Sequence, residues 1–340
     1  MSRPLALATA ALAAQVAAHG YLQSITLDGV TYEGYNYWNM ENRDPNHIGW
    51  SHTTQNEGPE PDLSSPDFAC RSGSEPAQSY GTVKAGGEAT FVWTSDDTDR
   101  NPEGWAHTGP IATYIARCPD DDCTSADKTA LQWVKIQEES VVEGTANDKG
   151  TWATDVLRQT GGAYSATIPE NLAAGKYVIR SELMALHRAH LGEPEFYMQC
   201  SNIEVTGSGT DDLSGAGGVT ASNLYSTSDD IFSFNLYNQN GETTWQVPGP
   251  PLYTGAAKSP ANGGDEEDVD AGQQPPPTSA DAPTPTPSQS EPVTEPAPTV
   301  QPDPVPTGDD DGGDDTYGGG DCQGRRPRKH KGKKAIRYRA

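Results

Sequence analysis

Two histidines stand in sequence contexts where they could bind a metal ion. His19 directly follows the small residues Val16-Ala17-Ala18, and His107 lies in the loop-like motif Gly104-Trp105-Ala106-His107-Thr108-Gly109-Pro110. Imidazole nitrogen is a common ligand for zinc, copper, iron and nickel. Taken alone, a histidine such as His107 is more often a loop residue that makes ordinary hydrogen bonds, so the neighbouring residues decide between the two interpretations.

The first eighteen residues have the pattern of a secretion signal. Arg3 supplies the positive charge, residues 5–16 are mostly Ala and Leu, and residues 16–18 are small. Cleavage after Ala18 would make His19 the first residue, which offers both an α-amine and an imidazole. The amine has a pKa of roughly 7.7–8.0, so a metal can displace its proton near neutral pH. With the His107 imidazole this gives three nitrogens in a T shape, which suits copper. A cut one or two residues away would leave His19 chemically ordinary.

A second group of polar residues precedes a cysteine later in the chain. His187 follows Ala185-Leu186, and ten residues further on begins Phe196-Tyr197-Met198-Gln199-Cys200. Side chains alternate along a strand, so Glu195 and Tyr197 should share one face. By itself this is a polar strand face without a claim on function.

Charge and composition limit the function classes. The chain of 340 residues has 23 Lys and Arg against 48 Asp and Glu, a net charge of −25. Such a charge argues against a nucleic-acid partner. No stretch after the signal is apolar for long enough to span a bilayer. These features indicate a secreted, extracellular protein, and we expect a monomer.

Secretion makes disulfides the expected state of the five cysteines. Cys118 and Cys123 bracket a short hydrophilic turn and form the obvious local pair. Cys70 and Cys200 then pair across a long loop, which contributes about 4–5 kcal/mol in the chain-entropy account. Cys322 is the odd one. A zinc site is a poor alternative, because the sequence has no Cys-x-x-Cys pair.

The segment 19–255 reads as an all-β domain. Short segments of period two recur between Gly, Pro, Asn and Asp, at residues 88–94, 131–136, 163–168 and 176–186. In the last of these, Arg180 and Glu182 should point away from the apolar face, as in a half-buried antiparallel strand. Many short strands predict an antiparallel β-sandwich of immunoglobulin-like or fibronectin-like type with long loops, such as residues 31–67.

The remainder of the chain has a different composition. Residues 256–320 are rich in Pro, Thr, Ser, Asp and Glu and contain almost nothing to bury, which predicts a disordered linker. Residues 321–340 form a basic tail in which nine of the last sixteen residues are Lys or Arg. Twenty residues with one cysteine are too few for a second folded domain.

Taken together, the motifs of residues 19–255 resemble a known family. The chain is similar to the fungal lytic polysaccharide monooxygenases of auxiliary activity family nine, formerly glycoside hydrolase family sixty-one. Each motif is weak singly, and together they are specific. They occur in the family's order at residues 19–25, 48–51, 65–67, 107–110, 127–129, 150–153, 185–187, 197–200, 204–207 and 248–250.

The resemblance implies a role for each site residue. It places the cleavage after Ala18, so that His19 binds one copper ion through its amine and imidazole, and His107 supplies the other imidazole. Tyr197 would lie at the axial position, and His187 could donate a hydrogen bond to the oxygen cosubstrate. Glu195 departs from the family pattern, which usually has Gln at this position; a carboxylate accepts where an amide could also donate.

The resemblance also implies the substrate and its binding surface. Such an enzyme oxidatively cleaves β-1,4-glucan chains, cellulose by default and hemicellulose as an alternative, with an external electron donor and oxygen or hydrogen peroxide. Its copper lies on a flat face where exposed aromatic rings stack on sugars. Tyr237 belongs to that face by resemblance. Tyr35, Tyr37 and Trp38 in the first long loop are weaker candidates, since aromatic residues there could simply pack the loop.

Three other function classes remain open at this point. A glycoside hydrolase would need two opposed carboxylates, and nothing in the sequence singles out such a pair. A non-catalytic copper-binding or cell-wall protein on the same fold would tend to lack the axial tyrosine and the neighbouring histidine, and both are present here. A pure carbohydrate-binding module would need neither His19 nor His107.

Overall fold

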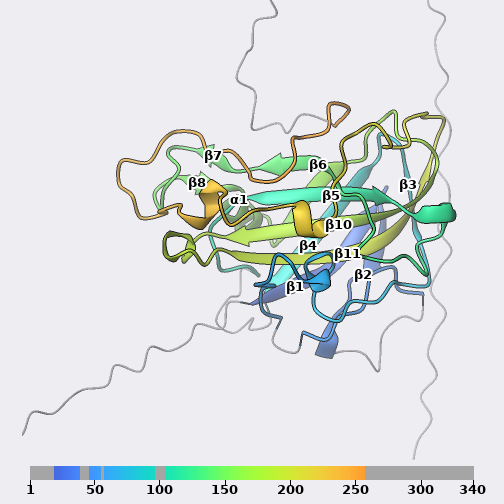
Figure 1. The fold of residues 1–340 in the computed structure, drawn as a ribbon, viewed down its shortest axis with the longest axis horizontal. Helices are drawn as coiled ribbons and strands as arrows, with labels where there is room; N and C mark the ends of the chain where they lie inside the picture. Colours follow the sequence, from blue (N-terminus) through green and yellow to red (C-terminus); the bar gives the residue numbers. More distant parts are fainter. Residues whose placement is uncertain (1–18, 39–45, 55–56, 96–103, 257–340) are drawn as a thin grey trace, which may run out of the picture. The chain divides into compact units, whose positions relative to one another are not determined.

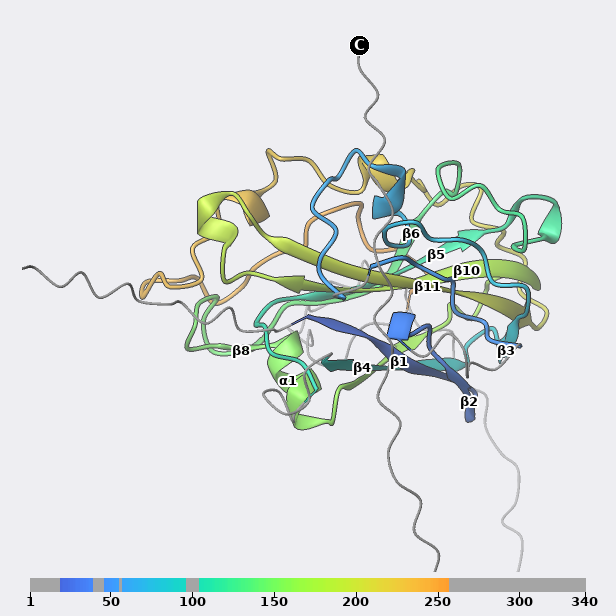
Figure 2. The same ribbon diagram turned by 90° about the horizontal axis from the view of Figure 1, so that it is seen from below.

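Two facing β-sheets make up the folded part of the chain (Figures 1 and 2). The computed structural model describes residues 19–38, 46–54, 57–95 and 104–256. One sheet has the strand order β2-β1-β4-β9, from β1 (Gly20–Leu27), β2 (Val30–Glu33), β4 (Glu88–Ser95) and β9 (Ala163–Thr167). The other has the order β3-β11-β10-β5-β6, from β3 (Gly81–Lys84), β5 (Ile111–Arg117), β6 (Val134–Glu139), β10 (Gly175–Ala185) and β11 (Glu195–Thr206).

The sheets confirm the predicted sandwich with one departure in direction. Every pairing within the two sheets is antiparallel except that of β3 with β11, which is parallel. Strands β7 (Val141–Glu143) and β8 (Thr151–Trp152) form a small ladder of their own. Three predicted strands agree closely with β4, β9 and β10. The fourth, expected over 131–136, is observed as β6 and begins at Val134.

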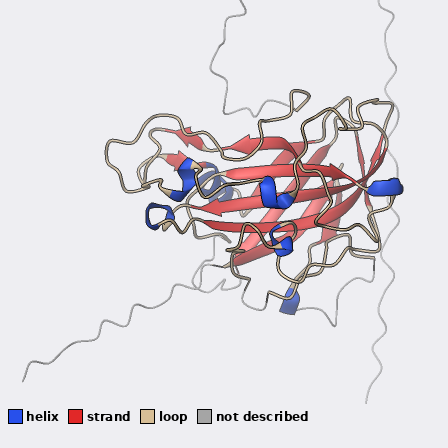
Figure 3. Cartoon of the chain, in the orientation of Figure 1, coloured by secondary structure: helices blue, strands red, loops and turns tan. Residues whose placement is uncertain are grey.

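Helices are few and short in the described residues (Figure 3). The single α-helix, α1, spans Ala153–Gln159 directly after β8. The other helices are 3-10 helices of three residues each: η2 (Pro66–Phe68), η3 (Pro119–Asp121), η4 (Ala189–Leu191), η5 (Ala221–Asn223) and η6 (Asp230–Phe232). None of the described helices is long and apolar enough to cross a bilayer.

Two apolar cores lie on opposite faces of the five-stranded sheet. The core between the sheets includes Phe91, Trp93 and Ile179. A second core, with Phe68, Tyr114 and Met198, lies under the loops that cover the outer face of that sheet. Figure 2 shows these loops as a layer above β10 and β11. Large apolar side chains therefore pack against both faces of the five-stranded sheet.

The second core corrects one prediction. The outward residues of β10 were expected at a half-buried surface, but Arg180 and Glu182 are both fully buried. Arg180 donates to Glu182 through Nη1 (2.7 Å) and Nη2 (3.1 Å), and its Nε donates to the Ala69 carbonyl (2.8 Å). The Tyr225 hydroxyl donates to the same carboxylate. The covering loops, which β-strand periodicity does not reveal, enclose this ion pair.

Both predicted disulfides are present. Cys70–Cys200 joins the loop before β3 to β11, and Cys118–Cys123 closes the turn after β5. The predicted signal, most of the linker and the basic tail with Cys322 lie outside the described residues.

Candidate metal centre and substrate face

The hairpin of β10 and β11 positions three residues of the expected site. In its register Ala185 pairs with Glu195, and Leu183 pairs with Tyr197. Glu195 and Tyr197 therefore lie on the same face of β11, as the alternation predicts, and Tyr197 belongs to the core between the sheets. His187 follows the end of β10 by two residues, so the hairpin brings it opposite the start of β11.

Glu195 lies at the centre of the polar cluster. Its Oε2 accepts a hydrogen bond from the Tyr197 hydroxyl (2.7 Å) and lies 3.8 Å from His107 Nε2. Its Oε1 lies 3.6 Å from His187 Nε2. The rings of His107 and His187 are stacked, with centroids 4.4 Å apart and planes inclined by 4°. One potential ligand atom from each of His107, His187 and Glu195 lies within 4.8 Å of the other two, a spacing that a metal ion could bridge.

The loop that carries His107 is held from two sides. From α1, Arg158 Nη1 donates to the His107 carbonyl (3.2 Å), and Thr154 Oγ1 accepts from the Gly109 amide (2.7 Å). From the hairpin, the Leu186 amide donates to the Thr108 carbonyl (3.0 Å). A Cβ at Gly109 would lie 2.0 Å from a β10 carbonyl oxygen, so only glycine allows this approach. The backbone of His107 is thus fixed against the hairpin that presents His187.

The His19 ring also lies near Tyr197. Its ring centroid is 6.5 Å from that of Tyr197, and the His107 centroid is 6.2 Å from it. The Trp105 ring packs edge-to-face on both Tyr197 and His107. A Cβ at Gly20 would lie 2.9 Å from the Trp105 indole, so the glycine after His19 lets β1 pack closely on this ring. Two imidazoles from distant segments therefore lie near the same phenol.

The protonation of His187 follows from its surroundings. Partial burial lowers the pKa of His187 below its ordinary value, and Arg188 acts in the same direction. The Glu195 carboxylate acts in the opposite direction, and its effect on this pKa is smaller than that of burial. His187 is therefore a neutral imidazole at neutral pH, with one nitrogen able to donate and one able to accept.

Comparison with known proteins identifies the family. Residues 19–245 match the family described as Auxiliary Activity family 9, formerly GH61. The chain belongs to this family. It is 38% identical over 251 residues to AA9 family lytic polysaccharide monooxygenase F of Emericella nidulans, covering 72% of this chain and 95% of that protein. It is 39% identical over 250 residues to monooxygenase F of Malbranchea cinnamomea, with the same coverage.

Solved structures of the family share the fold. The extended catalytic domain of H. jecorina LPMO9A superposes with a TM-score of 0.63 at 33% identity, over 70% of this chain and 92% of that one. A cellulose-active polysaccharide monooxygenase from M. thermophila gives 0.60 at 29% identity, over 70% and 100%. The protein is a lytic polysaccharide monooxygenase, an oxidoreductase, and members of its family are copper enzymes.

The aromatic residues predicted for the substrate face of the enzyme divide into two groups. Tyr237 is 49% exposed, and Trp38 is 65% exposed with Tyr37 packed edge-on against it. The Tyr237 hydroxyl lies 3.4 Å from the His187 carbonyl, which puts this side chain beside the cluster of His107, His187 and Glu195. The prediction that Tyr35 belongs to the substrate face is wrong. Its side chain is 3% exposed and packs on His52, so it cannot stack on a sugar.

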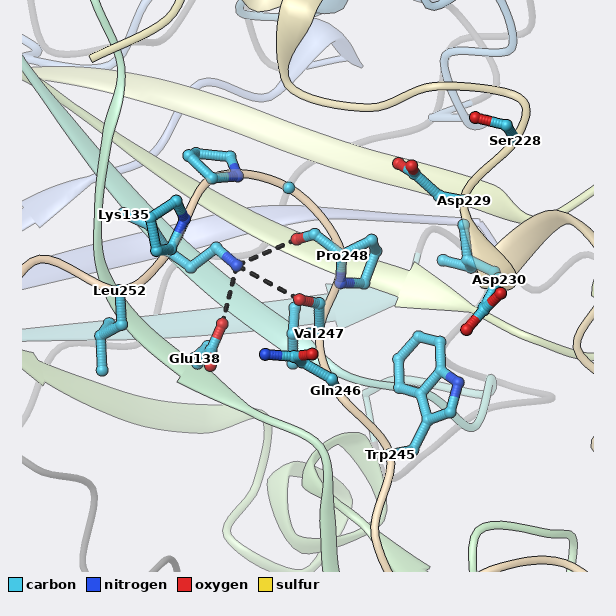
Figure 4. A pocket seen from close by; sticks show the side chains of 14 residues that line it. Lys135, Glu138, Ser228, Asp229, Asp230, Trp245, Gln246, Val247, Pro248 and Leu252 are labelled. Atoms are coloured by element: carbon cyan, nitrogen blue, oxygen red, sulfur yellow. Dashed lines mark hydrogen bonds and ion pairs between the residues drawn. The ribbon is translucent and has the colours of Figure 1, made fainter. Parts of the chain in front are cut away.

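A surface hollow of about 650 Å³ on the enzyme is lined by residues that do not belong to the candidate metal site (Figure 4). Lys135 is buried at its wall and donates to the Glu138 carboxylate (2.7 Å) and the Pro248 carbonyl (2.9 Å). Burial lowers the pKa of Lys135, and the Glu138 carboxylate opposes this. None of His107, His187 and Glu195 lines the hollow. We interpret Lys135 as the group that attaches the segment around Pro248 to the edge of β6.

Several residues around the centre were not predicted from sequence. Trp105 packs on the two central rings, and His190 packs edge-on against Tyr237. Trp105 lies two residues before His107, but this spacing in a loop does not reveal its contacts. Gln199 was identifiable, because it continues the alternation of Glu195 and Tyr197 along β11.

Proposed function

We propose that this protein is a secreted, copper-dependent lytic polysaccharide monooxygenase that oxidatively cleaves the β-1,4-glucan chains of cellulose, with hemicellulose as a further substrate. The observation that carries the proposal is the cluster of His107, His187, Glu195 and Tyr197, with the His19 ring near that of Tyr197. External partners would be a reductant and oxygen or hydrogen peroxide.

The donor atoms of the site fit one copper ion. Mature His19 would offer its amine and imidazole, and His107 its imidazole, a nitrogen-rich set of the kind that copper prefers. The Tyr197 phenol would lie next to the bound ion. When bound, copper supplies the one-electron redox chemistry that oxidises a C–H bond of the glycosidic linkage. Free His19 amine requires cleavage after Ala18, so N-terminal sequencing of the secreted protein should begin at His19.

The neighbouring residues would orient ligands and move protons. Tyr197 directs its hydroxyl proton to Glu195 Oε2, so its phenol is held as a neutral donor. His187, with its Nε2 3.6 Å from Glu195 Oε1, would donate a hydrogen bond to the oxygen cosubstrate, and the Glu195 carboxylate would help to orient the imidazole. Groups of this kind orient and tune a metal centre.

The substrate face would be a flat surface with exposed rings. Tyr237 lies nearest the cluster, and Trp38 with Tyr37 extends the aromatic surface from the first long loop. Exposed rings provide stacking area for sugar faces. Cellulose as substrate is supported by the similarity to the cellulose-active polysaccharide monooxygenase from M. thermophila. Two disulfides support an extracellular location.

Product analysis by mass spectrometry tests the proposal. The copper-loaded protein is incubated with cellulose and with hemicelluloses, with and without ascorbate. We expect oxidised oligosaccharides from cellulose that depend on the reductant. Reductant-independent, unoxidised products would indicate a hydrolase, and binding without any released product would indicate a non-catalytic protein.

A further inference from the structure

Among the described residues, the start of β1 has a strand neighbour on one edge only. On one edge, Gly20, Tyr21 and Leu22 pair with β4. On the other edge, β2 pairs with β1 only from Ser24 onward. The residues that connect His19 to the sandwich therefore have strand support on a single edge. A chain terminus with so little support would ordinarily fray.

Two buried side chains occupy the open edge in place of a strand. Arg71 Nη2 donates to the Gly20 carbonyl (3.1 Å), and Gln199 Oε1 accepts from the Leu22 amide. Gly20 and Leu22 are two residues apart, so their backbone groups point to the same edge of β1. The two side chains also contact each other, because Arg71 Nη1 donates to Gln199 Oε1 (3.4 Å). We refer to Arg71 and Gln199 as the anchor pair.

The anchor pair is rigidly supported. Arg71 and Gln199 are each adjacent to a cysteine of the Cys70–Cys200 disulfide, so a covalent bond holds the two segments together. Gln199 Nε2 also donates to the Tyr35 carbonyl (3.0 Å). Arg71 is buried and has a φ of +89°, a left-handed conformation that is unfavourable for a residue other than glycine. The fold therefore keeps an arginine at this position despite the backbone strain.

Charge compensation for Arg71 comes from a second buried group. Its Nη1 lies 3.4 Å from Glu57 Oε2, and His52 Nε2 lies 3.5 Å from the same oxygen. Arg71 Nη2 donates in addition to the Gly58 carbonyl (2.9 Å). A planar guanidinium can serve this many acceptors at fixed angles, whereas the ammonium of lysine cannot reproduce the fork.

The anchor pair also connects β1 to the strand that carries the axial tyrosine. Glu195, Tyr197 and Gln199 occupy one face of β11, so the strand that positions the cluster also binds the backbone of β1. We propose that Arg71 and Gln199 are positioning residues that fix the N-terminal histidine over Tyr197. Loss of the pair would leave His107 in place and allow the His19 end to move. The inference rests on the proposed copper function of His19.

A pair of buried arginines allows a matched test. Arg71→Lys removes the fork at β1, whereas Arg180→Lys removes an equally buried fork from Glu182 and Ala69. The partners of the Arg180 guanidinium in the described residues lie outside β1. Gln199→Met removes the Leu22 contact at similar size and serves if Arg71→Lys fails to fold. Copper(II) affinity and electron paramagnetic resonance spectra are measured for each protein, together with thermal stability.

We expect Arg71→Lys and Gln199→Met to weaken copper(II) binding by about 10–100-fold, the usual range for groups that orient a ligand, and to change the copper spectrum. Arg180→Lys should lose stability with unchanged affinity and spectrum. Wild-type affinity and spectrum in both anchor variants would overturn the inference, as would an equal effect of Arg180→Lys.

Hydrogen exchange of the metal-free proteins separates this inference from the proposed function. Peptides covering residues 19–27 should exchange faster in the anchor variants than in wild type or Arg180→Lys. Unchanged exchange would overturn the anchor role whether or not the protein binds copper. Failure of wild-type protein to bind copper would instead overturn the proposed function of His19, while leaving the exchange result to decide the anchoring of β1.

Discussion

At the scale of single residues, the carboxylate of Glu195 lies close to three other side chains of the candidate site. It accepts a hydrogen bond from Tyr197 and lies within 4 Å of one nitrogen of His107 and one of His187. A negative charge beside a metal favours the higher oxidation state. An amide at the same position would keep an acceptor for Tyr197 and remove the charge.

We therefore expect Glu195→Gln to retain copper and to raise the copper(II)/copper(I) potential. A rise of about 60 mV corresponds to a tenfold change in a one-electron equilibrium, and a change of this order is expected for loss of a nearby charge. Redox titration followed by spectroscopy measures it. Glu193→Gln, two residues earlier and exposed beside Arg188, is the matched control. Equal potentials in wild type and Glu195→Gln would contradict the prediction.

His107 is expected to be indispensable for copper. It is one of two imidazoles whose rings lie near Tyr197. Because groups that merely orient a ligand account for about 10–100-fold in affinity, His107→Ala should weaken copper(II) binding by more than about 100-fold. Isothermal titration calorimetry measures the affinity. His190→Ala, which removes an imidazole packed on Tyr237, is the control, and an unchanged affinity in His107→Ala would rule out the assigned role.

At the scale of elements, β10 combines two different environments. One face packs in the core between the sheets, and the other carries the enclosed pair of Arg180 and Glu182 beneath the loops. A buried ion pair does not by itself imply a net gain in stability. Removal of one partner, however, leaves an uncompensated charge in a fully buried site.

Glu182→Gln should accordingly destabilise the domain by about 3–5 kcal/mol, the range for breaking a buried pair. Urea denaturation monitored by tryptophan fluorescence gives the free energy of unfolding. The surface pair of Arg188 and Glu193 supplies the comparison, since Glu193→Gln should cost about 1 kcal/mol or less. Similar losses in the two variants would show that the enclosed pair has no special weight.

At the scale of the whole molecule, the charge is distributed very unevenly along the sequence. The chain has a net charge of −25, yet nine of its last sixteen residues are Lys or Arg. One hypothesis is that this run is only a solvated or self-paired charge cluster. The other is that the basic tail binds anionic polysaccharide and holds the catalytic domain near its substrate, raising the local concentration without new contacts at the metal centre.

Comparison of the full-length protein with a chain that ends at Gly255 distinguishes these hypotheses. If the tail binds, the full-length protein should bind pectin more tightly at low salt. The difference should vanish at high salt, because the Debye length falls from ~10 Å at 0.1 M to ~3 Å at 1 M. Activity on soluble substrate should not change. Equal pectin binding of the two proteins at low salt would exclude the tether.

Local patterns in the sequence determined the fold class and much of the metal centre. Alternation along β11 placed Glu195 and Tyr197 together, and cysteine spacing led to both disulfides. These features depend on neighbours along the chain or on a simple count. The family motifs then associated His19, His107 and His187 with one site.

Only the tertiary structure decided which polar and aromatic side chains are enclosed. Tyr35 stands in a loop beside the exposed Trp38, yet it is buried, and Arg180 lies on a face that strand periodicity assigned to a polar surface. Arg71 reaches Gly20 across 51 residues of sequence. Burial of these groups depends on loops that fold back over the sheets, and long-range packing of this kind leaves no periodic pattern in the sequence.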